Sequence, residues 1–377
     1  MIGSDLDSSR TQRTWTFTAR LLSALHLDGT LFTGLALLAL IGLVVVYSAS
    51  GGSATMLQAQ IAKLVLALIV MLVLAQVPPR LIRASAPWMY LAGLMLLVAV
   101  MFVGDVTMGA RRWLDLGIRF QPSEIMKIAM PLTCAWYLHE RPLPPTWLNV
   151  VIMLVAIVIP AAIIARQPDL GTAVLVTASG AMVVLLAGLR ARYIIAAGGL
   201  LVAGGIFGWQ FLHDYQRQRV LTFLDPQNDP LGSGYHIIQS QIAIGSGGAF
   251  GKGFMNGSQA QLEFLPERST DFIFAVIGEE WGFFGLFIVL LLYMFVIGRG
   301  LYLAATAQDT FARLVTGSLS LTFAVYALIN AGMVTGLLPV VGVPLPLISY
   351  GGTSMVTLMA GFGILMAVNA RRRLVGR

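Results

Sequence analysis

Charged residues are scarce in this chain of 377 residues, where they make up 11% of the total. An average soluble domain contains roughly 25%. Hydrophobic residues make up 57%, and the mean hydropathy is +0.82. So few polar side chains cannot cover a water-facing surface of this size. The deficit argues against an ordinary soluble domain and indicates that lipid surrounds most of the molecule.

Cysteine and histidine are also rare. The single cysteine, Cys134, excludes an intramolecular disulfide, and its place within an apolar run is typical of a small core residue. None of the four histidines is paired at metal-binding spacing. A Walker motif and a Gly-x-Ser-x-Gly nucleophile motif are both missing from the sequence. These absences argue against a disulfide scaffold, a His-based metal centre and intracellular ATP chemistry.

Apolar runs recur along the whole chain, and a spanning helix needs about 20 mostly apolar residues. We therefore predict an all-α, polytopic membrane protein with about ten spans. The spans are Leu31–Tyr47, Met56–Val77, Pro87–Val103, Ser123–Leu138, Trp147–Ala165, Leu170–Leu189, Tyr193–Leu212, Phe272–Ile297, Ala312–Leu338 and Thr353–Ala370.

One membrane domain over residues 1–377 is expected, with polar tails at 1–30 and 371–377. A large loop, 213–271, separates the seventh and eighth spans, and His236–Ala243 within it is a candidate interfacial helix. The N-terminal tail has neither the apolar core nor the cleavage site of a signal peptide.

The basic residues predict which way the chain crosses the membrane. With the N-terminus in the cytoplasm, fourteen arginines fall inside and eight basic residues fall outside, while Lys63 and Lys127 lie within spans. This excess predicts that both termini are cytoplasmic and that the large loop is extracytoplasmic. Because the basic residues are scattered in ones and twos between apolar runs, they do not indicate nucleic-acid binding.

Four polar segments meet at the predicted outer face. In the first, Glu124 and Lys127 are three residues apart, so they share a helix face and can pair. The pair either neutralises a helix that enters lipid or marks a functional site, since charges within a membrane are costly. The candidate site residues of this segment are Arg111, Trp113, Gln121, Ser123, Glu124 and Lys127.

The second and fourth segments lie beside helix ends. Gln167 and Asp169 form the second, in which Asp169 is placed either to cap a helix or to join the site. The fourth contains Ser349, Gly351 and Gly352 next to two prolines. Irregular backbone at membrane depth must be buried in protein or line a cavity.

The third segment contains Glu267, Arg268, Thr270 and Asp271, where the long loop becomes a helix. Asp271 suits either a helix cap or acid–base catalysis. The neighbouring carboxylates Glu279 and Glu280 lie roughly 12–14 Å deeper along that helix, at about 1.5 Å per residue.

A site lined by cations and carboxylates suits an anionic, lipid-linked substrate, because cations hold phosphates and a carboxylate can move a proton. An enzyme, a transporter and a scaffold protein all remain open at this point. The inner halves of the spans are almost uncharged, whereas a transporter needs polar groups along the whole path. The pattern therefore favours an enzyme at the outer face.

Five motifs carry a family resemblance. They are Gln121-Pro122-Ser123-Glu124-x-x-Lys127, Gln167-Pro168-Asp169-Leu170-Gly171-Thr172, Phe264-Leu265-Pro266-Glu267, Thr270-Asp271-Phe272-Ile273-Phe274-Ala275 and Ile348-Ser349-Tyr350-Gly351-Gly352. In this order, over nearly the whole chain, they resemble the SEDS family (shape, elongation, division and sporulation). The segment 262–268 and the short tails resemble the elongation branch, RodA, more than the division branch, FtsW. Ser269 stands where relatives often have His.

The resemblance implies a peptidoglycan glycosyltransferase that polymerises lipid II outside the bacterial cytoplasmic membrane during elongation. The implied mechanism is inverting, releases undecaprenyl diphosphate and uses Asp271 as catalytic base. Arg111, Lys127 and Arg268 are candidates for neutralising the diphosphate, with Glu124 orienting Lys127. No cofactor or metal-ligating residue is assigned, although Mg²⁺ or Mn²⁺ is an option.

The implied partners are a class B penicillin-binding protein, which is a transpeptidase, and other proteins of the elongation complex. The runner-up function is a lipid II flippase, and a scaffold role is the third.

Overall fold

The computed structural model describes residues 26–107, 110–115, 119–193, 233–262, 264–265 and 267–370, with scattered positions between 195 and 227. Within that part of the chain, seven helices are long and apolar enough to cross a membrane. They are α2 (Gly29–Ala49), α3 (Ala54–Gln76), α4 (Pro79–Val103), α6 (Trp147–Arg166), α12 (Ile273–Ala305), α13 (Thr310–Val334) and α14 (Thr353–Ala370). The described residues also form four shorter helices, which are α5 (Pro122–Leu138), α7 (Leu170–Leu186), α10 (Ser233–Gly247) and α11 (Ser258–Gln261).

The all-α membrane fold is confirmed, and the predicted spans coincide with helices wherever the structure describes them. The predicted span Tyr193–Leu212 lies almost wholly outside the described residues. The number of ten spans therefore stays a prediction. The helix of the third predicted span, α4, begins at Pro79 rather than at Pro87. Pro79 occupies the first turn, where no backbone N–H is needed, and Pro87 is tolerated inside a membrane helix.

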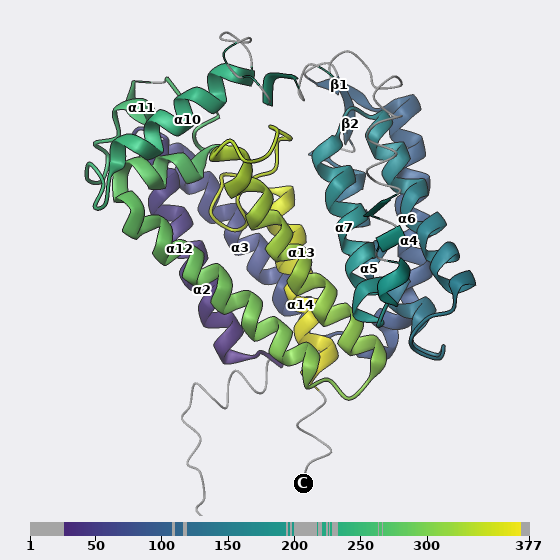
Figure 1. Ribbon diagram of the computed structural model, residues 1–377. Helices are drawn as coiled ribbons and strands as arrows, with labels where there is room; N and C mark the ends of the chain where they lie inside the picture. Colours follow the sequence, from purple (N-terminus) through teal and green to yellow (C-terminus); the bar gives the residue numbers. More distant parts are fainter. Residues whose placement is uncertain are drawn as a thin grey trace, which may run out of the picture.

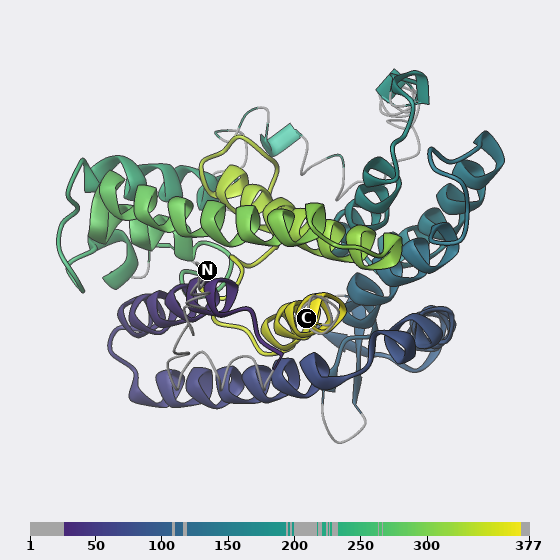
Figure 2. The same cartoon turned by 90° about the horizontal axis from the view of Figure 1, so that it is seen from below.

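The helices pack in two groups joined by α13 and α14, which lie at the centre of Figure 1. One large apolar core joins α2, α3 and α12, and a second joins α4 to α7; both include side chains of α13 and α14. The view from below in Figure 2 shows α14 enclosed between the two groups. The two central helices therefore hold the groups in a fixed relation.

A small antiparallel sheet joins α4 to α5, and the prediction of helices alone missed it. Its strands, in order, are β1 (Asp105–Thr107), β2 (Ala110–Asp115) and β3 (Arg119–Phe120). Val106 pairs with Arg111 in β2, and Leu114 pairs with Phe120. Strands this short present too few residues for an alternating pattern to be visible. The sheet brings the chain back to the start of α5.

A sharp break divides α12 at Gly282, where φ is 67° and ψ is −163°. The Gly-rich stretch before α11 replaces the helical hydrogen bonds lost there. Lys252 N donates to Glu279 O at 3.0 Å, and Phe283 N donates to Gly248 O at 2.9 Å. The first half of α12 is therefore fastened to the loop that precedes it.

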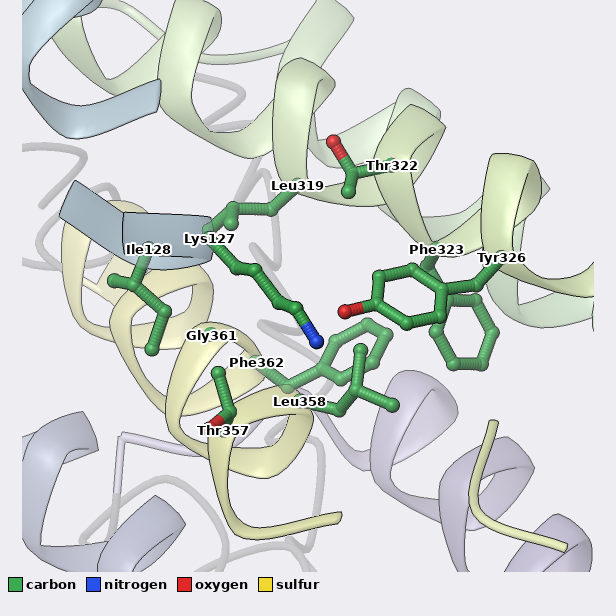
Figure 3. Close-up of a pocket in the computed structure, with 10 residues that line it drawn as sticks. All are labelled: Lys127, Ile128, Leu319, Thr322, Phe323, Tyr326, Thr357, Leu358, Gly361 and Phe362. Atoms are coloured by element: carbon green, nitrogen blue, oxygen red, sulfur yellow. The ribbon is translucent and has the colours of Figure 1, made fainter. Parts of the chain in front are cut away.

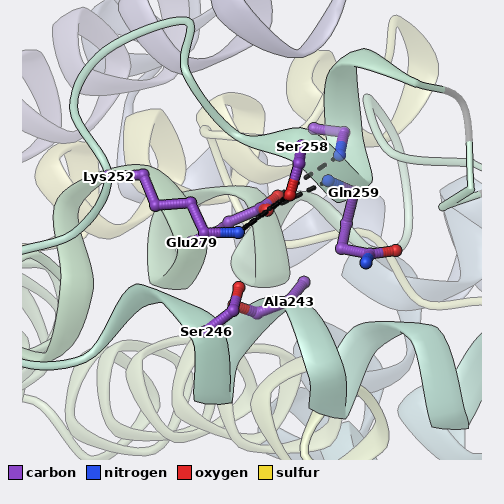
Figure 4. A network of polar contacts seen from close by, with 7 residues as sticks. Ala243, Ser246, Lys252, Ser258, Gln259 and Glu279 are labelled. Atoms are coloured by element: carbon purple, nitrogen blue, oxygen red, sulfur yellow. Dashed lines mark hydrogen bonds and ion pairs between the residues drawn. The ribbon is translucent and has the colours of Figure 1, made fainter.

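Two buried carboxylates strengthen this attachment. Glu279 accepts from Lys252 Nζ at 2.7 Å, from Ser258 Oγ at 3.1 Å and from the backbone of Gln259 at 2.9 Å, as Figure 4 shows. Glu280 accepts from Ser48 Oγ of α2 at 2.6 Å. Both glutamates are thus bound within the protein and hold the loop, α2 and α12 together.

Candidate active site

A polar cavity of about 290 Å³ lies where the four polar segments converge, which confirms that they meet in the fold. Its walls come from the sheet, the first turns of α5 and α7, the turn before α12 and the segments on either side of Ser349. The lining residues are Arg112, Trp113, Gln121, Glu124, Lys127, Asp169, Thr172, Leu175, Thr270, Asp271, Gly342, Val343, Pro344, Tyr350, Gly351, Gly352, Thr353 and Ser354.

Asp271 lies in this cavity and does not cap a helix. The N-cap of α12 is Phe272, and no side chain caps that helix. Burial, and secondarily the negative charge of Glu267, raises the pKa of the Asp271 carboxyl from 3.8 to about 6. A carboxyl with this pKa can accept a proton near neutral pH.

The backbone around Asp271 is held from two sides. Asn330 Nδ2, on α13, donates to Asp271 O at 2.7 Å and to Val343 O at 2.8 Å. Ser349 Oγ donates to Thr270 O at 2.6 Å. These bonds join the turn before α12 to the opposite wall, so Asp271 cannot shift without disturbing both.

Glu124 and Lys127 form the predicted ion pair, with 2.6 Å between Nζ and Oε1. Both are buried, and the second carboxylate oxygen of Glu124 has no partner among the described residues. Lys127 also lines a second, small cavity of about 30 Å³, where its Nζ lies 5.3 Å from the ring centre of Tyr326 (Figure 3). Its ammonium group therefore separates the polar cavity from a nearly apolar one.

Asp169 both caps a helix and lines the cavity. It accepts from Thr172 N at 3.1 Å at the start of α7, and from Gln121 Nε2 at 2.9 Å. The guanidinium of Arg112 donates to the main-chain oxygens of Gln167, at 3.1 Å, and of Pro168. These contacts join the sheet, α5 and α7 around the cavity.

Nine of the fifteen residues predicted for the site line the cavity. Five others do not line it. Ser123 is buried behind the cavity, and Ser349 supports the wall from behind. Gln167 donates to Leu97 O, Arg268 donates to Ala260 O, and the exposed Glu267 accepts from Thr270. The side chain of Arg111 lies outside the described residues.

Sequence reasoning missed Arg112 and Tyr350 as lining residues and Asn330 as a supporting residue. Arg112 follows the predicted Arg111, and alternation along β2 was the signal that could have separated the two. Tyr350 lies inside a motif already identified. Asn330 is one of several buried polar residues of α13, and nothing in its local sequence connects it to Asp271.

The charges of the lining are mixed: two cations, Arg112 and Lys127, face three carboxylates, Glu124, Asp169 and Asp271. Over the described part of the chain, no group of three or more His, Cys, Asp or Glu side chains could hold a metal ion. The cavity therefore combines a proton acceptor with a few engaged cations, and it is not built as a protein-only metal centre.

Comparison with known proteins gives a consistent result. The model of the cell cycle protein family FtsW, RodA and SpoVE matches residues 29–374. The chain is 52% identical over 354 residues to "Peptidoglycan glycosyltransferase MrdB" of Escherichia coli K12, covering 93% of this chain and 96% of that one. It is 40% identical over 298 residues to the MrdB of Helicobacter pylori 26695, covering 76% of each.

Solved structures share the fold as well. One, described as "Structural coordination of polymerization and crosslinking by a peptidoglycan synthase complex", contains a chain with a TM-score of 0.79 and 34% identity, covering 92% of this chain and 98% of that one. The crystal structure of the rod shape determining protein RodA of Thermus thermophilus gives a TM-score of 0.70 at 29% identity, covering 92% and 97%. The chain belongs to the FtsW, RodA and SpoVE family of integral membrane proteins, as its motifs had indicated.

Proposed function

We propose that the protein is a peptidoglycan glycosyltransferase that polymerises lipid II into glycan strands during cell elongation. The observation that carries the proposal is the cavity around Asp271, where a carboxyl with a pKa of about 6 faces the cations of Arg112 and Lys127. The relatives at 52% and 40% identity are both named peptidoglycan glycosyltransferases.

Asp271 acts as the base. Its carboxylate takes the proton from the 4-hydroxyl of the acceptor sugar, and the resulting oxygen attacks the anomeric carbon of the donor glycan. The bond to the diphosphate breaks on the opposite face of the sugar, and the electron pair leaves with undecaprenyl diphosphate. An α-linked donor and a β-linked product require one inversion. By analogy with inverting glycosidases, one carboxylate base activates the nucleophile.

The leaving diphosphate requires charge neutralisation more than a proton. Lys127 and Arg112 line the cavity and supply positive charge where negative charge develops. Glu124 holds Lys127 in place through the ion pair at 2.6 Å. Arg268 was expected to share this task, but it donates to Ala260 O and does not line the cavity.

A divalent cation remains a separate proposal. Mg²⁺ commonly binds through one or two carboxylates together with substrate phosphates, rather than through a protein-only cage. Besides the base Asp271, the carboxylates of the cavity that could contribute are Asp169 and Glu124, and the ion would neutralise the diphosphate. Loss of polymerisation on addition of a chelator, and its recovery with Mg²⁺ or Mn²⁺, is the expected sign of such an ion.

The proposed setting is the cytoplasmic membrane of a bacterium, with both termini in the cytoplasm and the cavity at the outer face. The first residue of α2 and the last residue of α14 lie on the same side of the bundle (Figure 1). A class B penicillin-binding protein is the proposed partner, since a related chain occurs in a peptidoglycan synthase complex.

The test is polymerisation of lipid II by the purified protein in detergent, with and without that partner. Wild type is compared with Asp271→Asn, and Asp309→Asn is the control because Asp309 is exposed at the far end of α13. We expect glycan chains from wild type and Asp309→Asn and none from Asp271→Asn, with equal thermal unfolding midpoints. Synthesis of glycan chains by Asp271→Asn would show that Asp271 is not the catalytic base.

The buried charges and broken helices of the structure also fit the runner-up function, a lipid II flippase. It makes a different prediction for the same experiment. If no variant produces glycan chains under any condition, the polymerase assignment fails, and transfer of labelled lipid II across vesicles becomes the decisive measurement.

A further inference from the structure

Lys63 is a cation in the middle of the membrane-spanning helix α3. The other lysines of the chain, Lys127 and Lys252, each pair with a glutamate. Among the residues that the structure describes, Lys63 has neither a carboxylate partner nor a hydrogen bond, and its ammonium group contacts an aromatic ring. A charge at this depth is costly, and such residues usually mark a binding site or pathway.

The side chain of Lys63 lies against the back of the cavity wall. Its Nζ is 3.6 Å from the ring centre of Tyr350, and a Cβ on Gly352 would lie 3.6 Å from the Lys63 stem. One turn earlier, Gln60 Nε2 donates to Ser349 O at 3.1 Å. The helix α3 therefore carries polar side chains that contact the 349–352 segment.

Space is open next to this segment. A Cβ on Gly351 would meet no atom within 4 Å, and Tyr350, Gly351 and Gly352 all line the main cavity. Lys63 itself is only partly buried. A ligand that reaches past the 349–352 segment can therefore approach the ammonium group.

The main cavity has too little free positive charge for two diphosphates, and Lys63 can supply more. Its two cations are already engaged, Lys127 by Glu124 and Arg112 by two main-chain oxygens, and its carboxylates outnumber them. Polymerisation of a lipid-linked sugar brings together two substrates that each carry a diphosphate. One cavity with two engaged cations has little positive charge left to neutralise both diphosphates.

We propose that Lys63, with the 349–352 segment, forms a second anion site that binds the phosphates of one of the two lipid-linked substrates. The inference rests on the proposed function, because a polymerase has two such substrates. The chemistry recognised is the diphosphate of a polyprenyl-linked substrate at the outer leaflet. Tyr350 holds the ammonium group when the phosphate is absent, through a cation–π contact that a phosphate outcompetes.

The first test measures binding of undecaprenyl diphosphate to the full chain in nanodiscs of neutral lipid, with undecaprenol as the ligand without phosphate. Lys63→Met keeps the stem and removes the charge, Lys63→Arg keeps the charge, and Arg313→Met removes an exposed cation from the start of α13. We expect Lys63→Met to weaken binding of the diphosphate by about tenfold or more. Lys63→Arg should bind nearly as wild type, and undecaprenol should not distinguish the variants.

Kinetics provide a second readout. With lipid II as substrate, Lys63→Met should raise KM while changing kcat little, and Arg313→Met should change neither. If Lys63→Met does not fold, Lys63→Gln takes its place. Unchanged binding and KM in a folded variant without the charge overturn the proposal.

Two further arms separate the possible sources of phosphate and the possible failures. If the charge of Lys63 affects binding of phosphatidylglycerol but not of undecaprenyl diphosphate, the site serves a phospholipid and the proposal is overturned. If wild type binds the diphosphate through Lys63 but polymerises nothing, the proposed function fails while the anion site stands. If wild type polymerises and Lys63→Met is unaltered, only the anion site fails.

Discussion

Asn330 holds Asp271 by its main chain: Nδ2 of the asparagine donates to Asp271 O at 2.7 Å and to Val343 O at 2.8 Å. Asn330 is fully buried, and it is 59 residues from Asp271 along the chain. One side chain thus connects α13 to the turn that presents the proposed base and to the wall that faces it.

Replacing Asn330 by Leu should lower kcat by roughly 10- to 100-fold, because a misplacement of about 1 Å can cost that much. Each carbonyl left unpaired should cost about 1–3 kcal/mol of stability. The measurement is lipid II polymerisation together with thermal unfolding. Asn149→Leu is the control, since Asn149 is buried in α6 and bonds to Tyr137 and Arg141 instead. Wild-type kcat in folded Asn330→Leu would show that Asp271 does not depend on this contact.

The polymerisation rate should depend on pH through Asp271. Its pKa is raised to about 6, and the base must be ionised, so the rate should fall as the pH drops through about 6. Glu267→Gln removes a like charge that raises this pKa, so the midpoint should move to lower pH. Glu140→Gln, at an exposed residue of another loop, should leave it unchanged. An unchanged midpoint in Glu267→Gln would show that Glu267 does not raise the pKa of Asp271.

The ion pair of Glu124 and Lys127 should separate stability from activity. Lys127→Met leaves a buried, unpaired carboxylate, which should cost about 3–5 kcal/mol of stability. The double variant Glu124→Gln, Lys127→Met removes both charges and should recover most of that loss in thermal unfolding. Neither variant should polymerise lipid II, because the cation that faces the diphosphate is missing. Glycan synthesis by the double variant at the wild-type rate would exclude Lys127 from the reaction.

The break in α12 should tolerate no side chain at Gly282. A Cβ there would lie 2.3 Å from Gly251 N, and the positive φ is strained for any other residue. Gly282→Ala should therefore lower stability by about 1–3 kcal/mol or more, measured by thermal unfolding. Gly298→Ala is the control in the same helix, since a Cβ there meets no atom within 4 Å. Equal unfolding midpoints for the two variants would mean that the break is not a structural requirement.

The helices and the segments of the site were predictable because their signals are local. Lipid demands long apolar runs, and each such run marks a helix by its own composition. The pair of Glu124 and Lys127 follows from their spacing of three on a helix. The cap at Asp169 follows from its place before α7.

Contacts between distant segments were not predictable. Asn330 with Asp271, Ser48 with Glu280, and Lys252 with Glu279 are each 27 or more residues apart in sequence. No periodicity encodes which distant partner a polar residue meets. For the same reason, Arg268 was assigned to the phosphates although it points to Ala260.

The sequence by itself determined that the protein lies in a membrane, that its polar chemistry gathers in four segments and that Asp271 is the strongest candidate base. Those conclusions depend on composition, spacing and motif. The tertiary structure decided that Arg112 rather than Arg268 lines the cavity, that Glu279 and Glu280 fasten a loop, and that Lys63 lies behind Tyr350. Packing brings these groups together because buried polar atoms must find partners in a medium without water.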